Sequence, residues 1–184
     1  MTDLTRRSFA LGAAATTLAA CGNGIGSAGA ATIDARVDST LNAMYQAYPG
    51  TRDLASQAAG ILVMPLVTEV GLGLGGSFGR GALRVGQSTV DYYAAASGSA
   101  GLQIGAQQFS HVLFFMTQES LQEFRRSQGW AAGADVEYAF SNQAEMLRAE
   151  TTTSLSPVIA AVFGQTGLRV GATLEGTKYT RIIP

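Results

Sequence analysis

Gly71-Leu72-Gly73-Leu74-Gly75-Gly76-Ser77 is the stretch of sequence that decides the fold, because its pattern occurs three times in the chain. The other copies are Gly101-Leu102-Gln103-Ile104-Gly105-Ala106-Gln107 and Gly167-Leu168-Arg169-Val170-Gly171-Ala172-Thr173. In an extended chain the two apolar residues of each copy share one face, and glycines lie on the other face. Because glycine weakens a strand, its repetition indicates sharp bends or close backbone approach, which strongly curved sheets need. We therefore predict three similar strands within one strongly curved, Gly-rich antiparallel sheet.

The remaining pattern predicts an α+β domain, in which N-terminal helices and one later helix accompany a barrel- or sandwich-like sheet. The first helix shows an apolar stripe at helical spacing, formed by Ile33, Val37, Leu41, Met44, Tyr45 and Tyr48. This stripe is expected to pack on the core. A membrane-lying helix is the alternative, although such helices usually carry more lysine and arginine beside their apolar face.

Capping residues predict two shorter helices. Thr51 is expected to cap a helix that runs to residue 59 and stops at Gly60. Thr117 is expected to cap a helix near residues 117–128, with Leu121 and Phe124 facing inward. Pro65 is expected to end the first of several further strands. These strands are predicted at residues 61–64, 82–85, 90–95, 109–116, 136–140, 158–163 and 178–183.

The composition indicates one packed domain and excludes several classes of function. The 184 residues are 47% hydrophobic and 14% charged, which is typical of a globular chain and not of a disordered one. The formal net charge of −1 argues against nucleic acid as a partner and predicts no strong attraction to anionic lipid. One cysteine, Cys21, and one histidine, His111, are too few for a Cys/His zinc site. We expect neither a metal nor a cofactor.

The first twenty residues resemble a signal for export. Arg6 and Arg7 stand before Phe9 and an apolar run, as in signals of the twin-arginine type, which carry proteins that are already folded. The run covers residues 9–18 and is far shorter than the about 20 residues that span a bilayer, so it fits a signal-peptide core. We therefore expect residues 1–20 to be removed as a signal peptide.

Leu18-Ala19-Ala20-Cys21 looks like the lipobox of bacterial lipoproteins, in which acyl chains such as palmitate are attached to the cysteine. The alternative is an ordinary small-residue cleavage site beside a chance cysteine. By analogy with Gram-negative sorting, Gly22 favours the outer membrane over the inner one. Residues 21–31 are rich in glycine and are predicted to form a flexible tether. Residues 32–184 would then form one domain in the cell envelope, held at the outer membrane and facing the periplasm.

Two motifs that suggest chemistry are weak in their context. Residues 71–76 match the G-x-G-x-x-G motif of nucleotide-binding folds, but the residues that follow do not readily continue a helix. Ser110 and His111 suggest a nucleophile and a base, with Asp91 or Asp135 as a third member, yet no nucleophile-elbow motif is present. Neighbours in a strand point to opposite faces, so His111 is expected to be structural. We predict no enzymatic activity.

Longer segments of the chain resemble the SYLF domain family, a lipid-binding module of bacteria and eukaryotes. The resemblance covers residues 32–183, and it is carried by Gly60-Ile61-Leu62-Val63-Met64-Pro65, residues 71–83, Val90-Asp91-Tyr92-Tyr93, residues 99–107, Phe115-Met116-Thr117, Ser127-Gln128-Gly129-Trp130, Gly133-Ala134-Asp135 and Leu174-Glu175-Gly176-Thr177-Lys178. The resemblance implies binding of phospholipid or a membrane surface, without catalysis.

The resemblance also implies which part binds lipid, and here the chain departs from the family. Eukaryotic relatives are associated with phosphoinositides and actin, and their lipid binding is attributed partly to an N-terminal amphipathic segment, equivalent to residues 33–48. Many relatives have lysine where this chain has Glu69, and basic residues are sparse. Membrane association is therefore expected here, and a phosphoinositide ligand is not.

The resemblance and the predicted anchor together favour a lipid-anchored envelope protein with a non-catalytic domain that binds phospholipid. The candidates for lipid contact are Arg80, Arg84, Trp130, Arg169 and Lys178. Trp130 is more simply a plug of the core, although indole also suits a membrane interface. The alternative function is a structural or adaptor lipoprotein, in which Cys21 alone holds the membrane and the domain binds another envelope protein.

Overall fold

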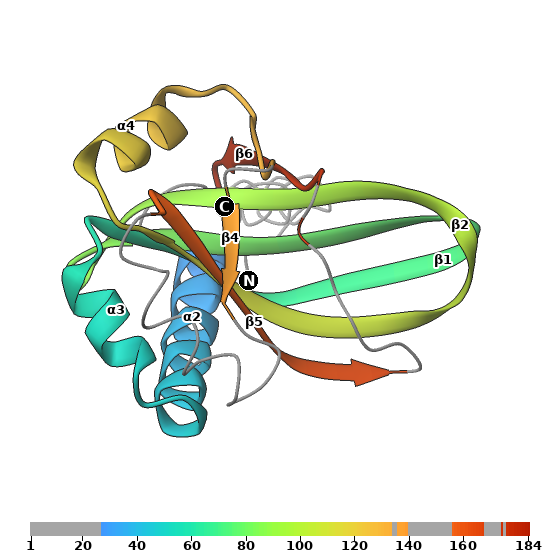
Figure 1. Cartoon of the computed structure of the whole chain (residues 1–184), viewed down its shortest axis with the longest axis horizontal. Helices are drawn as coiled ribbons and strands as arrows, with labels where there is room; N and C mark the ends of the chain where they lie inside the picture. Colours follow the sequence, from blue (N-terminus) through green and yellow to red (C-terminus); the bar gives the residue numbers. More distant parts are fainter. Residues whose placement is uncertain (1–26, 134–135, 140–155, 168–173, 175) are drawn as a thin grey trace, which may run out of the picture.

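The computed structural model describes residues 27–133, 136–139, 156–167, 174 and 176–184. Within these residues it has three helices and a six-stranded sheet, which confirms the α+β class with a strongly curved sheet (Figure 1). In chain order the elements are α2 (Ala28–Ala47), α3 (Thr51–Gln57), β1 (Gly60–Val85), β2 (Ser88–Phe115), α4 (Gln118–Arg126), β3 (Trp130–Ala131), β4 (Val136–Ala139), β5 (Val158–Gly167) and β6 (Lys178–Ile182). The strand order is β3-β6-β2-β5-β4, with β1 paired to β2.

β1 and β2 form one very long hairpin, and both of its strands bend back on themselves. They pair from Gly60 opposite Phe115 to Val85 opposite Ser88, around a tight turn at Gly86, whose φ of 59° suits glycine. Both strands run away from the helices, bend and return, so the bend lies at the far end of the molecule (Figure 1). β6 pairs with the part of β2 before the bend, and β5 pairs with the part after it.

The first two glycine-rich copies lie at this bend, on strands that are neighbours in the sheet. Gly71 of the first copy is opposite Gly105 of the second. Gln107, the last residue of the second copy, is opposite Gly167, the first residue of the third. The rest of the third copy, which includes Arg169, lies outside the described residues. The predicted link between the repeat and the curvature is therefore confirmed for the first two copies.

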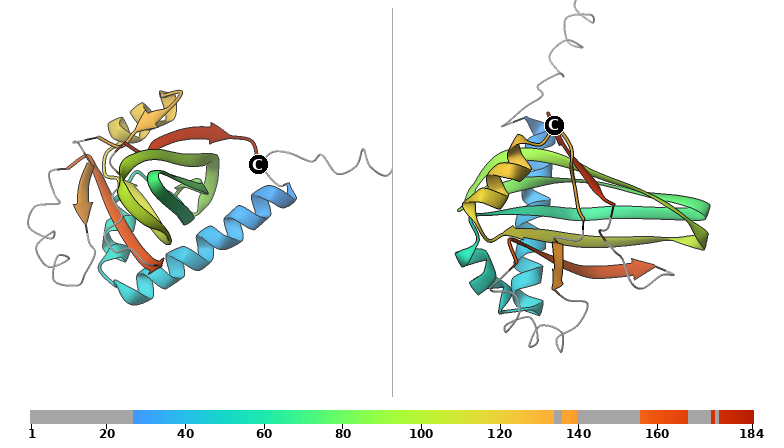
Figure 2. Two further views of the ribbon diagram at one scale, coloured as in Figure 1. Left: turned by 90° about the vertical axis from the view of Figure 1, so that its right-hand side faces the viewer. Right: turned by 45° about the horizontal axis from the view of Figure 1, so that its top comes forward.

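Glycines also let the two halves of β1 approach each other closely. A Cβ atom at Gly81 would overlap the carbonyl oxygen of Val63 and would lie 2.6 Å from Sδ of Met64. At Gly79 a Cβ atom would lie 2.7 Å from Cγ2 of Val67. Because this seam has no room for side chains, the halves of the hairpin close on each other and the sheet curls, as the end-on view shows (Figure 2).

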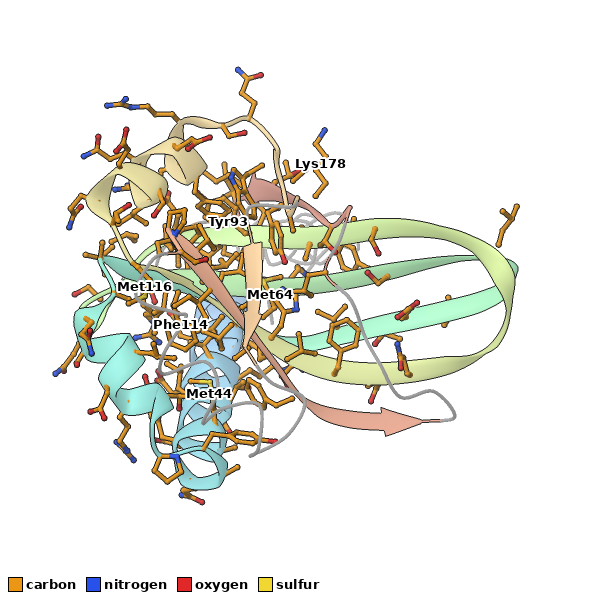
Figure 3. The ribbon with its side chains drawn as sticks, viewed as in Figure 1. Met44, Met64, Tyr93, Phe114, Met116 and Lys178 are labelled. Carbon is orange, nitrogen blue, oxygen red and sulfur yellow. The ribbon has the colours of Figure 1, made fainter. Side chains whose placement is uncertain are left out.

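Two hydrophobic cores lie at the helical end of the hairpin, one on each face of the sheet. The inner core lies between the two halves of the hairpin, where Met64 and Tyr93 meet Phe124 of α4. The outer core lies between the sheet and α2, where Phe114 meets Met44. Figure 3 shows these side chains gathered at the helical end, away from the bend.

α2 is fastened to the sheet by its apolar stripe and by an acidic residue. The stripe predicted over residues 33–48 lies in and against the outer core, so packing on the core is confirmed. Asp34 accepts hydrogen bonds from Oγ1 of Thr89 at 2.7 Å and from the hydroxyl of Tyr92 at 2.8 Å. Burial and the bond to Asp34 raise the pKa of Tyr92 to about 12, so Tyr92 remains a donor at neutral pH. The apolar face of α2 is therefore not free to lie on a membrane.

The strand predictions are correct in position, but those that fall in β1, β2 and β5 are too short, while that for β6 is one residue too long and that for β4 extends one residue beyond the described strand. Residues 61–64 and 82–85 are the two ends of β1, while residues 90–95 and 109–115 belong to β2. Pro65 does not end a strand, because the register shifts beside it and a residue without an N–H is tolerated there. β4 pairs with β5 in parallel, so the sheet is not wholly antiparallel, and the short β3 is an addition to the predicted strands.

The helices also lie where the sequence predicts them, with different ends. Ser27 caps α2, so this helix includes residues 28–31, which the sequence assigned to the tether. Gly50 precedes α3, and the hydroxyl of Thr51 donates to a carbonyl of the preceding turn, so Thr51 is not the cap. Thr117 caps α4, as predicted. In the part of the chain that the structure describes, none of the helices is long and apolar enough to span a bilayer.

Candidate functional site

Four large apolar side chains are exposed along β1, around the bend of the hairpin. Their exposed fractions are 41% for Leu66, 54% for Val70, 77% for Leu74 and 55% for Phe78. We call these four residues the apolar row. Among the described side chains, Ile183 near the C-terminus is the other large apolar residue that is exposed. A group of large apolar side chains exposed to water is typical of a surface that contacts a protein or a membrane.

Two basic residues lie beside Phe78 on the same face of the sheet. Phe78 is opposite Ala96 of β2, and Ala96 is opposite Lys178 of β6, so the three share one row across the strands. Arg80 follows two residues after Phe78 and is opposite Ala94 in the next row. Arg80 and Lys178 are exposed, and Lys178 projects from the surface (Figure 3). Strand spacing places the backbone of Lys178 about 10 Å from that of Phe78.

Arg84, in contrast, is not available for lipid contact, which corrects the prediction made for it. Its Nη2 lies 2.7 Å from Oδ1 of Asp38 and 3.7 Å from Oδ1 of Asp34. Both carboxylates belong to α2, and the side chain of Arg84 is largely buried between helix and sheet. Its charge is therefore used to hold α2 in place.

Trp130 packs as a partly buried plug, as the sequence predicts. Its ring lies 5.5 Å from the ring of Phe124 and 5.8 Å from that of Tyr179, measured between centroids. Its strand β3 pairs with β6, so Trp130 and Lys178 are close in the fold. The remaining predicted site residues, Arg6, Arg7, Cys21 and Arg169, lie outside the described residues.

His111 lies in the inner core and is placed for a structural role. Its Nε2 is 2.8 Å from the hydroxyl oxygen of Tyr179, and burial lowers its pKa to about 3. Because this pKa is below the ordinary 6.5, neutral His111 supports the fold above pH 6.5, and that support is lost as the pH falls towards 3. Ser110 donates instead to the carbonyl of Pro65, while Asp135 lies outside the described residues. The geometry therefore does not pair Ser110 with His111.

A cavity of about 560 Å³ lies beside α4, with Trp130 in its wall. Glu119 and Glu123 also line it, and these carboxylates are unsuited to an anionic headgroup. Among the described residues there is no group of three or more His, Cys, Asp or Glu side chains that could hold a metal ion. The apolar row with Arg80 and Lys178 is thus the surface that best fits a membrane.

Sequence reasoning did not identify the apolar row as a site. A signal was present, because residues 70–79 contain no charged side chain while they keep several large apolar ones. The periodicity of a strand, however, does not tell which of its faces is exposed. Lys178 was proposed without any link to Phe78, since the two residues are far apart in the sequence.

A family model described as Ysc84, Las17-binding protein actin regulator, matches residues 96–181. This confirms the SYLF resemblance over that range, which includes Ala96 and Lys178. No curated protein matches the chain.

Proposed function

We propose that this chain, whose residues 96–181 match the Ysc84 family model, is a lipid-anchored envelope protein whose non-catalytic domain contacts phospholipid. One observation carries this proposal: on one face of the sheet, Phe78 of the exposed apolar row has Arg80 two residues along its own strand and Lys178 in the same row across the strands. Apolar side chains that enter lipid and cations that meet phosphate are the two attractions that hold proteins at membrane surfaces.

The energies of these contacts are sufficient for weak, reversible binding. Burying a large apolar side chain completely is worth about 1.5–3 kcal/mol, and the members of the apolar row are 41–77% exposed in water. Each arginine or lysine near an anionic surface adds about 1 kcal/mol. Because the formal net charge is −1, the attraction depends on where Arg80 and Lys178 lie and not on the total charge.

The proposed anchor keeps this surface near the bilayer. Acyl chains, palmitate among them, would be attached to Cys21 after residues 1–20 are removed, and the protein would face the periplasm from the outer membrane. The segment between Cys21 and Ser27, where the described fold begins, spans at most about 20 Å. Such a short link holds the domain at a high local concentration beside the lipid.

Metabolic labelling tests the anchor. In a Gram-negative host, the native chain should incorporate a palmitate analogue and fractionate with the outer membrane, while Cys21→Ser should remain unlabelled. Arg6→Lys with Arg7→Lys should block export if the leader is of the twin-arginine type. A native protein that is soluble in the cytosol, with its leader uncut, would contradict both the anchor and the location.

Vesicle co-sedimentation tests direct lipid contact without the anchor. A chain that begins at Gly22 lacks the acylation site and keeps every element described here. It should bind vesicles that contain phosphatidylglycerol, and Arg80→Gln with Lys178→Gln should weaken this binding by at least about tenfold. The matched control, Arg36→Gln with Arg126→Gln, removes the same charge from exposed residues of α2 and α4 and should change binding less than about twofold.

An adaptor function is the second candidate, because the matching family is described by the binding of a protein. In that case Cys21 alone would hold the membrane, and the domain would bind another envelope protein. The chain that begins at Gly22 would then fail to bind vesicles of any composition. A photo-crosslinker at Lys178 would instead capture one defined envelope protein in cells.

A further inference from the structure

We propose that the bend of the folded hairpin enters the acyl-chain layer of the bilayer, with Leu74 deepest and with Arg80 and Lys178 at the level of the phosphates. This inference rests on the proposed function, since it names the part of the domain that meets the lipid. We define the bend as residues 70–79 of β1 and residues 96–106 of β2.

The polarity of the hairpin is inverted towards the bend. At the helical end its inner face carries Met64 and the other apolar residues of the inner core. Closer to the bend, the inner face carries polar pairs instead. Nε2 of Gln107 donates to Oε2 of Glu69 at 2.6 Å, and the hydroxyls of Ser77 and Ser97 are 2.7 Å apart.

This inversion is the arrangement that an apolar solvent favours. Gln107, the residue that follows the bend on β2, is only 2% exposed, while Leu74 of the apolar row is 77% exposed. Water favours polar groups outside and apolar groups inside, because apolar surface is driven out of water. Strands that contact lipid show the opposite, with apolar side chains outward and polar ones inward. The bend follows the pattern of strands that contact lipid.

The bend carries no charge that would oppose insertion. Residues 70–79 contain no Asp, Glu, Lys or Arg, and neither do residues 92–118 of the next strand and its continuation. A single charged side chain at the centre of a bilayer is costly, so this absence removes the largest barrier. On β1 the charged residues that bracket the bend are Glu69, which is bound to Gln107, and Arg80.

Backbone pairing continues through the bend, as an apolar environment requires. Val70 is opposite Ala106 and Gly76 is opposite Gly98, with one register shift between Leu72 and Leu74. These hydrogen bonds between β1 and β2 satisfy backbone groups that would find no partner in lipid. The N–H and C=O groups on the outer edges of a two-stranded ribbon have no such partners. The insertion is therefore shallow and does not cross the bilayer.

The bend is also the part of the described fold that a membrane reaches without obstruction. The helices α2, α3 and α4 lie at the opposite end or on the sides of the hairpin (Figures 1 and 2). None of them extends past the bend in these views.

Depth-dependent fluorescence quenching tests the inference. The chain that begins at Gly22 contains no cysteine, so Leu74→Cys accepts one environment-sensitive label, and Gln122→Cys on the exposed side of α4 is the matched control. With phosphatidylglycerol vesicles, the label at residue 74 should shift to the blue. Spin labels on the acyl chains should quench it more than spin labels on the headgroup. The label at residue 122 should not change.

An unlabelled pair of variants gives an independent measure. Leu74→Asp should weaken vesicle binding by at least about tenfold, because it places a charge in the apolar layer. Gln122→Asp adds the same charge to the protein and should leave binding nearly unchanged. Equal thermal stability of the two variants shows that the difference arises at the membrane.

The outcomes separate this inference from the proposed function. If the parent chain binds vesicles but the label at residue 74 stays in water, the insertion of the bend is wrong and lipid contact by the domain stands. If the parent chain does not bind vesicles at all, the proposed function fails. A blue shift that grows with protein concentration in the absence of vesicles would show that a second copy covers the apolar row, which also overturns the insertion.

Discussion

Gly81→Ala is expected to lower the free energy of unfolding by about 3 kcal/mol. The added methyl group would overlap the carbonyl oxygen of Val63 and would press on Sδ of Met64. A flexible side chain can move aside, but a backbone carbonyl within a paired strand cannot do so without breaking the seam between the halves of β1. Chemical denaturation followed by circular dichroism would measure the loss.

Gly98→Ala is the matched control for this prediction. A Cβ atom at Gly98 meets nothing within 4 Å, so the same methyl group should change the stability by less than about 1 kcal/mol. If Gly81→Ala proved as stable as Gly98→Ala, the halves of β1 would not be in close contact. The curl of the sheet would then not arise from close approach of these two halves.

Phe124→Ala is expected to cost about 3–5 kcal/mol, because it opens a cavity where α4 meets the inner core. Phe124 is fully buried, and its ring centroid lies 4.7 Å from those of both Tyr93 and Phe115. It also packs against Trp130, at 5.5 Å. The fluorescence of Trp130, the one tryptophan in the chain, should therefore shift to the red while denaturation occurs at lower urea concentration.

Phe78→Ala removes the same ring at an exposed position, so it should leave the stability nearly unchanged and weaken vesicle binding instead. Its ring belongs to the apolar row and to neither core, so the stability should change by less than about 0.5 kcal/mol. Vesicle binding should weaken by about fivefold, corresponding to about 1 kcal/mol of apolar burial. A large loss of stability in Phe78→Ala would mean that this ring supports the fold and is not kept for a partner.

The burial of α2 changes where lipid contact is expected in this protein. The SYLF resemblance pointed to residues 33–48 as an amphipathic segment for lipid. Here the apolar stripe of that segment packs in the outer core, and Asp34 is bound by Thr89 and Tyr92. Release of α2 would expose the outer core to water, so the bend of the hairpin reaches a membrane with far less cost to the fold.

Local sequence patterns by themselves determined the class of the fold and the positions of most of its elements. The repeated glycine pairs predicted curvature, the spacing of the stripe predicted α2, and Thr117 predicted the start of α4. These features depend on neighbours along the chain, because helix capping and strand alternation act over a few residues. The structural role of His111 followed in the same way, from its place on the apolar face of a strand.

Only the tertiary structure decided how far the strands extend and which residues meet at the site. The predicted short strands join into β1 and β2 because the hairpin folds back on itself and each half supports the other through the seam at Gly79 and Gly81. Lys178 comes beside Phe78 because β6 pairs with β2, although Lys178 and its partner Ala96 are far apart in the sequence. Whether a strand's apolar face is buried or exposed depends on what packs against it. At the bend, no described element packs against the outward face of β1. The alternation of side chains that builds a core elsewhere therefore leaves the apolar row exposed there.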